Sequence, residues 1–322
     1  MPNSSSSSTS VPGAEAGAAA APAECLVIGA GPAGLVAATY LARFRRRIAL
    51  VDAGASRARW IPTSHNCPGF PLGVSGEKLL QRMREQAGEH GVVATPGRIE
   101  TLQREGDAFV AGDAAGQHWR ATNVILATGI VDRLPRVEGG PASLAAAIDA
   151  GVLRLCAVCD AYEASDVRIG VLGPGADAVR HGLFLRTFSR QVDAIPSQPG
   201  AVDAADSARA RDAGLALRAP LRQLDCDAER CRVTFEDGSR HDYDTLYPVL
   251  GGDAQAQLAR GLGAEVDDEG ALVTDRHQQT SVAGLYAIGD VVSALNQIAV
   301  AVGHAAIAAT AIHNRLPSNP RG

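Results

Sequence analysis

The sequence predicts an α/β protein that contains two related Rossmann-like units. A short apolar run, a glycine-rich turn and an Ala/Leu-rich helical stretch follow one another within residues 24–52, and the same order returns within residues 167–196. With 322 residues the chain is long enough for about two domains. Gly is frequent at 35 residues and only 20 % of residues are charged, so we expect a compact protein with many tight turns.

Charge and hydropathy exclude several classes of partner. The net charge is −5, and the positive charges are scattered Arg residues apart from Lys78, without a long basic block, so no nucleic-acid partner is expected. Residues 25–42 and 291–312 are uncharged and nearly long enough to span a membrane. The first contains a glycine-rich turn and the second contains polar side chains, so we expect no membrane insertion.

Residues 1–23 have a different composition from the rest of the chain. They are rich in Ser, then in Ala, Gly and Pro, and Glu15 is their only charged side chain, so we expect a disordered tail. A secretory signal places basic residues before an apolar stretch, whereas the first Lys or Arg here is Arg43. We therefore expect no export and a cytoplasmic location.

The first unit has the glycine spacing of a dinucleotide site. A strand over residues 24–29 leads into a G-x-G-x-x-G turn formed by Gly29, Gly31 and Gly34. Gly29 permits the tight turn, Gly31 lets the backbone approach a pyrophosphate, and Gly34 allows the helix to pack closely on the strand. Asp52 ends the next apolar run, where it is placed to accept hydrogen bonds from a ribose. The alternative is an ordinary turn in an α/β unit.

A segment far along the chain indicates which dinucleotide binds. Residues 285–290 read as a strand that ends in Gly289 and Asp290, and an apolar helical stretch follows at residues 297–312. Asp290 is placed to meet a ribityl hydroxyl. The N-terminus of the following helix would point at a flavin ring, where its dipole stabilises the negative charge of a reduced flavin. We therefore expect FAD.

These motifs resemble the thioredoxin reductase family, the class II pyridine nucleotide-disulfide oxidoreductases, over about residues 24–316. Four separate motifs occur in the order that the family has. The resemblance implies that FAD is also contacted by Asn66, Thr128, Gly129 and Gln297. Taken singly, Asn66 is equally a turn residue and Gln297 equally an amide on a helix surface.

The resemblance also implies the domain organisation. We expect two Rossmann-like three-layer domains, the second inserted in the first. The FAD-binding domain would consist of residues 24–135 and 252–316, and the NAD(P)-binding-like domain of residues 136–251. The family further implies a homodimer.

Cys156 and Cys159 form a C-x-x-C motif, which near a βαβ pattern indicates a redox dithiol. Asp160 follows directly and is suited to move the proton of thiol–disulfide exchange, or else caps a helix or lies in a solvated loop. A zinc site would need two further ligands, for which only Cys226 and Cys231 offer a pair, so no metal is expected. By resemblance, Cys159 faces the flavin and bonds to it transiently, Cys156 exchanges with the substrate, and Asp160 is the general acid.

The remaining cysteines and one histidine receive no firm role. Cys25 lies in the first strand and is expected to be a small buried hydrophobe. Cys67 stands beside the expected flavin site, as a packing residue or a redox bystander. Cys226 and Cys231 flank an acidic turn of a hairpin and form either a structural or an adventitious pair. His65 either assists the flavin site or belongs to a surface loop.

The second unit repeats the first but differs at its decisive position. Gly173, Gly175 and Ala178 form its glycine-rich turn, which by resemblance holds NADPH or NADH. The position that corresponds to Asp52 is Pro196. An acid there would bind the 2′-hydroxyl of NADH, and a nearby Arg would bind the 2′-phosphate of NADPH. Neither is present.

We therefore expect an FAD-dependent thiol–disulfide oxidoreductase whose Cys156/Cys159 pair relays electrons to a thioredoxin-like protein or a small disulfide, with NAD(P)H as the default donor. The thioredoxin reductase family has a stretch of basic residues near this position, which is absent here. Relatives that lack this stretch include dithiol oxidases, which pass electrons from a small dithiol to O2, and others resemble ferredoxin-linked reductases. Both stay open as alternatives. A third is a flavin redox sensor, which would complete one redox change and stop.

Overall fold

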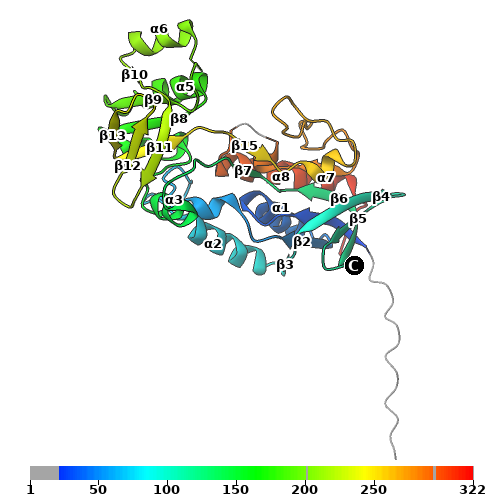
Figure 1. The fold of residues 1–322 in the computed structure, drawn as a ribbon. Coiled ribbons are helices and arrows are strands. Elements are labelled where there is room, and N and C mark those ends of the chain that lie inside the picture. Colours follow the sequence, from blue (N-terminus) through cyan, green and yellow to red (C-terminus); the bar gives the residue numbers. More distant parts are fainter. Residues whose placement is uncertain (1–21, 201, 293–294, 322) are drawn as a thin grey trace, which may run out of the picture.

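The computed structural model describes residues 22–200, 202–292 and 295–321. The predicted tail therefore lies outside the described residues, apart from its last two positions. Ala23 already belongs to the first strand, β1 (Ala23–Ile28), one residue before the expected start. Figure 1 shows two lobes, the first around helices α1 and α8 and the second, in green and yellow, around strands β8 to β13.

The first lobe is built on a seven-stranded sheet with the order β3-β2-β1-β6-β5-β4, and β16 pairs with β6. β1, β2, β3, β6 and β16 run parallel, whereas β4, β5 and β6 form an antiparallel meander. The bounds of the further strands are β2 (Ile48–Asp52), β3 (Ala94–Pro96), β4 (Ile99–Glu105), β5 (Ala108–Asp113), β6 (His118–Leu126) and β16 (Leu285–Ala287). The carboxyl ends of the parallel strands consequently meet along one edge, where α/β proteins bind ligands.

Helices α1 (Pro32–Arg43) and α8 (Ile298–Arg315) pack against each other on this sheet. Pro32 starts α1, where its fixed φ suits the first helical turn. The buried face of α8 consists mainly of alanines, including Ala301, Ala305 and Ala308, and such small side chains let two helices approach closely. The first lobe also contains η1 (Arg57–Trp60), α2 (Gly76–Gly88), α7 (Gln257–Arg260) and η3 (Gly289–Val291).

The second lobe has a four-stranded parallel sheet with the order β10-β9-β8-β14 and a separate antiparallel meander of β11, β12 and β13. Its strands are β8 (Ile169–Gly173), β9 (Val192–Pro196), β10 (Ala216–Leu217), β11 (Leu221–Cys226), β12 (Cys231–Phe235), β13 (Arg240–Tyr243) and β14 (Thr245–Pro248). Its helices are α3 (Gly140–Asp149), α4 (Ala157–Asp160), η2 (Tyr162–Ala164), α5 (Gly175–Leu185) and α6 (Ala204–Asp212). Cys226 and Cys231 stand opposite each other in the meander and form a buried disulfide.

Two antiparallel strands, β7 (Ile130–Asp132) and β15 (Gly252–Ala254), connect the lobes. The chain leaves the first sheet after β6, passes through β7 to the second lobe, and returns through β15 before it adds β16 to the first sheet. The predicted fold class, two Rossmann-like units with the second inserted in the first, is therefore confirmed. The domain limits at 135/136 and 251/252 stay a prediction. Within the described residues, no helix has both the length and the apolar character that crossing a membrane requires.

The glycine turn leads to a testable consequence for stability. A Cβ added at Gly34 would lie 1.8 Å from the backbone oxygen of Gly29, so the helix and strand would have to separate. We expect Gly34→Ala to lower the free energy of unfolding by about 3 kcal/mol. Gly88→Ala is the matched control, because its Cβ would meet no atom within 4 Å, and it should be neutral or slightly stabilising. Urea unfolding of both variants measures this, and equal midpoints would contradict it.

Candidate functional site

A cavity of about 510 Å³ opens at the carboxyl edge of the first sheet and extends to the connection between the lobes. It collects residues from segments far apart in the sequence. Of the residues predicted to contact FAD, all but Gly34 line it: Gly29, Gly31, Asp52, Asn66, Thr128, Gly129, Gly289, Asp290 and Gln297. Cys156, Cys159 and Asp160, which come from the second lobe, border the same cavity.

The glycine turn forms one wall with its bare backbone. Gly29 has φ +102°, and a Cβ there would lie 2.5 Å from the backbone oxygen of Ala127. A Cβ at Gly31 would come within 3.2 Å of Ser56 Oγ. Asp52 Oδ1 accepts a hydrogen bond from the Ala30 N–H at 2.9 Å. Asp52 therefore also fixes the turn, a role that the spacing alone did not reveal.

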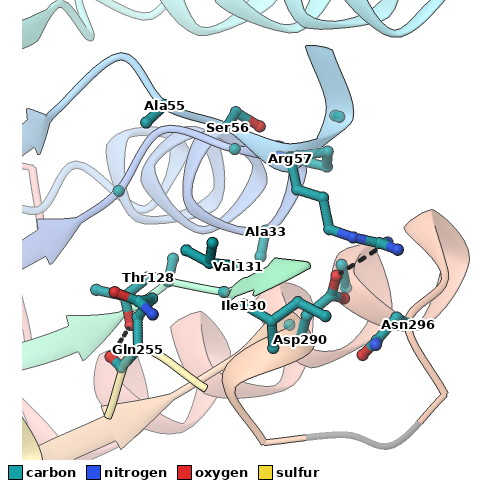
Figure 2. Close-up of a pocket in the computed structure, with 18 of the residues that line it drawn as sticks. Ala33, Ala55, Ser56, Arg57, Thr128, Ile130, Val131, Gln255, Asp290 and Asn296 are labelled. Atoms are coloured by element: carbon teal, nitrogen blue, oxygen red, sulfur yellow. Dashed lines mark hydrogen bonds and ion pairs between the residues drawn. The ribbon is translucent and has the colours of Figure 1, made fainter. Parts of the chain in front are cut away.

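The end of β6 and the start of β7 form the floor. The Thr128 hydroxyl donates to the backbone oxygen of Gln255 at 2.7 Å (Figure 2). Gly129 follows with φ +65°, a conformation that favours glycine. The chain thus turns from the first sheet toward the second lobe beneath the cavity.

A partly buried arginine that the sequence analysis missed occupies one corner. Arg57 forms a bidentate pair with Asp132 at 2.7 and 2.9 Å, and its Nη1 lies 3.8 Å from Asp290 Oδ2 (Figure 2). Burial raises the pKa of Asp290, and the Arg57 charge opposes that rise. The cluster holds two carboxylates and one guanidinium at the place where a ribityl chain is expected.

The fit of this cavity to FAD rests on its own atoms. Asn296 lies beside Asp290 in Figure 2 and lines the cavity, and its Oδ1 is buried without a hydrogen-bond partner among the described residues. A buried polar atom of this kind is satisfied by a ligand or by water. The bare glycine turn at the N-terminus of α1 suits a pyrophosphate. We conclude that the residues present fit the dinucleotide.

Cys156 and Cys159 form a disulfide at the edge of the cavity, with an S–S distance of 2.04 Å. Gln297 Nε2 lies 3.4 Å from both sulfur atoms. Asn66 Nδ2 donates to Gln297 Oε1 at 2.8 Å, and the Ser64 hydroxyl donates to Asn66 Oδ1 at 2.9 Å. This chain of hydrogen bonds fixes the Gln297 amide with its N–H groups toward the disulfide.

Asp160 is held by two partners from the second lobe. The Tyr247 hydroxyl donates to Asp160 Oδ1 at 2.9 Å, and Arg154 Nη1 lies 3.5 Å from Oδ2. Burial raises the pKa of Asp160, and Arg154 and the Tyr247 hydrogen bond only partly oppose this. A carboxyl with a raised pKa carries a proton over a wider pH range, as a general acid must.

The glycines of the second unit are explained by packing. A Cβ at Gly173 would lie 2.6 Å from Val249 Cγ2, and Gly175 and Ala178 are buried where α5 packs on its sheet. Gly173 pairs with Pro196, the last residue of β9. Next to β9, Arg218 Nε donates to the buried Asp193 Oδ2 at 2.7 Å.

The chain resembles known proteins over most of its length. Residues 23–305 match the family model of pyridine nucleotide-disulphide oxidoreductases. The chain belongs to this family. This pyridine nucleotide-disulphide oxidoreductase is 31 % identical to a thioredoxin reductase of Mycolicibacterium smegmatis over 284 residues, which cover 84 % of this chain and 88 % of the relative.

Two solved structures share the fold of this oxidoreductase along nearly the whole chain. HlmI superposes with a TM-score of 0.81 at 30 % identity, covering 91 % of this chain and 92 % of HlmI. A thioredoxin reductase of Streptococcus pyogenes superposes with a TM-score of 0.83 at 26 % identity, covering 92 % of this chain and 98 % of that one. The chain is therefore a disulfide oxidoreductase that resembles thioredoxin reductase.

Proposed function

We propose that this enzyme is an FAD-dependent thiol–disulfide oxidoreductase that works as a homodimer in the cytoplasm. Electrons pass between FAD in the 510 Å³ cavity and the Cys156–Cys159 disulfide, and on to a thioredoxin-like protein or a small disulfide. The observation that carries the proposal is that the disulfide borders the same cavity as the glycine turn. FAD, when bound in this cavity, would supply a two-electron acceptor and donor for the disulfide.

The cysteines and Asp160 perform the exchange. When a dithiol substrate is oxidised, its first thiolate attacks Cys156 Sγ, the Cys156–Cys159 bond breaks, and Cys159 leaves as a thiolate. Asp160 holds the proton that neutralises this thiolate. The second substrate thiolate then attacks the substrate sulfur of the mixed disulfide and releases Cys156. Two electrons and two protons leave the substrate, and the two cysteines end as a dithiol. Reduction of a disulfide is the reverse.

The test of this function is turnover. We expect one FAD per chain in the purified protein and repeated cycles when donor and acceptor are both in excess. A protein that binds FAD but completes a single redox change would be a flavin redox sensor instead.

The raised pKa of Asp160 predicts the pH dependence of the exchange. In the wild type, kcat/KM for a dithiol should rise with pH and level off above the pKa of Asp160, because the gain in substrate thiolate is then offset by loss of the protonated acid. In Asp160→Asn we expect rates about 100-fold lower below that pKa, with a rise that continues to the pKa of the substrate thiol. Asp268→Asn, an exposed control, should keep the wild-type profile. An unchanged profile in Asp160→Asn would contradict the role.

A nicotinamide-independent enzyme is the second candidate, either a dithiol oxidase that uses O2 or a ferredoxin-linked reductase. Pro196 at the end of β9 favours it, because this residue offers no acid or guanidinium to a ribose. Arg218, the neighbouring cation, is already bound to Asp193, whose other partner is the Tyr243 hydroxyl.

Anaerobic reduction by NADPH and NADH separates the two candidates. Because the end of β9 carries neither recognition group, we expect the two nucleotides to bleach the flavin at rates within about fivefold of each other, since one exposed charge contact is worth roughly 1 kcal/mol. A dithiol should bleach it faster than either. Stoichiometric bleaching of the flavin by NADPH alone would contradict this expectation and would identify NADPH as the electron donor.

A further inference from the structure

A second hollow, of about 260 Å³, lies beside the disulfide and is distinct from the 510 Å³ cavity. We call it the outer hollow. His65 and Asn66 from the first lobe and Phe184 and Phe188 from the second contribute to its walls. The remaining lining residues belong to α4 of the C-x-x-C motif and to η2, which supplies Tyr162 and Glu163. Cys159 and Asp160 line both this hollow and the cavity. Cys156, the residue whose sulfur the substrate attacks, does not itself line the hollow. Its Sγ is bonded to Cys159 Sγ at 2.04 Å, so a substrate held in the hollow has to extend only past Cys159 to reach it.

One wall of the outer hollow is apolar and faces solvent. Tyr162 is 77 % exposed, Val158 55 % and Phe184 41 %. Phe184 packs edge to face on Phe188, with 5.5 Å between the ring centroids. Large apolar side chains that gather around a concave surface mark a binding site, because a ligand there removes their area from water.

The acidic and basic side chains of the outer hollow are two carboxyl groups and one imidazole. Asp160 and Glu163 contribute carboxyl groups, and His65 Nδ1 lies 3.7 Å from Glu163 Oε1. Among the ten lining residues, all within the described part of the chain, there is no Lys or Arg. A ligand carboxylate would meet the Glu163 carboxylate without a Lys or Arg side chain to pair with it. The hollow thus favours neutral or cationic molecules.

We propose that the outer hollow binds small thiols and disulfides that have an apolar body and no carboxylate. This inference rests on the proposed function, whose exchange step it leaves unchanged: the bound dithiol loses two electrons and two protons, and the Cys156–Cys159 bond is reduced to two thiols. The volume of about 260 Å³ lies just below the range of pockets for drug-sized ligands. The hollow adds selection of the substrate by size, apolar area and charge.

Dihydrolipoamide and dihydrolipoate test the charge selection, because they differ only in an amide against a carboxylate. Each is added anaerobically to the oxidised holoenzyme, and reduction of Cys156 and Cys159 is followed by alkylation and mass spectrometry. We expect the amide to react roughly fivefold faster, as an interaction near 1 kcal/mol implies. In Glu163→Gln the ratio should fall toward one. Equal rates in the wild type would overturn the inference.

Phe184→Ala tests the apolar wall. It should slow dihydrolipoamide about tenfold, because the lost apolar contact is worth roughly 1.5 kcal/mol. Dithiothreitol, which has a short dihydroxylated carbon chain in place of the long apolar one, should keep its rate. Tyr40→Ala is the matched control, because Tyr40 is 39 % exposed against 41 % for Phe184 and does not line the hollow. Equal effects of Phe184→Ala on both dithiols would overturn the inference. A wild-type disulfide that even dithiothreitol leaves intact would instead overturn the proposed function.

Discussion

Cys156→Ser should lower turnover with dithiol or disulfide substrates by at least about 1000-fold, since removing a nucleophile costs this much or more. A serine hydroxyl at this position does not exchange with disulfides, so the relay loses its entry sulfur. Bound FAD should be retained, because the glycine turn and the Arg57 cluster that line the cavity are unchanged. Turnover and flavin absorbance of the same preparation give both quantities.

Cys67→Ser is the control for Cys156→Ser. Cys67 is a buried free cysteine that packs with Val74 and Leu79 and does not line the 510 Å³ cavity. It should therefore keep turnover near the wild-type rate. A Cys156→Ser enzyme that turns over at the parent rate would contradict the relay, whatever the control does.

Arg57→Met should weaken FAD binding about 100-fold, because it leaves two partly buried carboxylates without their shared cation. Arg57, Asp132 and Asp290 have side chains only 22 %, 18 % and 20 % exposed. Burial already raises the pKa of Asp290, and the Arg57 charge opposes this rise. Removal of Arg57 should therefore raise the pKa of Asp290 further. Asp290 would then be protonated over more of the pH range and accept a ribityl hydroxyl poorly.

Arg59→Met is the matched control, because Arg59 lies in the same short helix. It forms an ion pair with Glu77 in which both side chains are exposed, Arg59 at 53 % and Glu77 at 58 %. This pair should contribute less than about 1 kcal/mol to stability. Titration of the apoprotein with FAD, followed by flavin fluorescence, measures both affinities. Equal dissociation constants for the two variants would show that Arg57 does not act on the cofactor.

The parts of the site that the sequence predicted are those encoded by short segments. Gly29, Gly31 and Gly34 act within one turn, and that turn follows from the apolar strand before it and the Ala-rich helix after it. Cys156, Cys159 and Asp160 lie within five residues. Local backbone rules are sufficient to recognise such motifs, since the positive φ of Gly29 and the close approach of Gly34 to Gly29 both arise within the turn itself.

The contacts between distant segments were not predictable in the same way. Arg57 and Asp132 are 75 residues apart, and nothing around Arg57 distinguishes it from the many other arginines of the chain. The sequence left Cys226 and Cys231 as either a structural or an adventitious pair, and the register of β11 and β12 places them opposite each other, where they form a disulfide. Tertiary geometry supplied what spacing left undetermined.

The second unit shows where a correct fold prediction leaves function open. Its strand, turn and helix form as predicted, yet Gly173 is explained by the close approach of Val249, with or without a nucleotide. In this unit, packing thus accounts for Gly173 even though Pro196 at the end of β9 offers a ribose neither an acid nor a guanidinium.

The most direct measurement is anaerobic reduction of the purified wild-type enzyme by dithiothreitol, followed by the absorbance of oxidised flavin and compared with Cys156→Ser. The account predicts that the wild type contains one FAD per chain and loses its oxidised-flavin absorbance. It also predicts that Cys156→Ser keeps that absorbance under the same conditions. Equal bleaching of both proteins, or a wild type that binds no FAD, would contradict the claim that the Cys156–Cys159 disulfide exchanges electrons with the flavin.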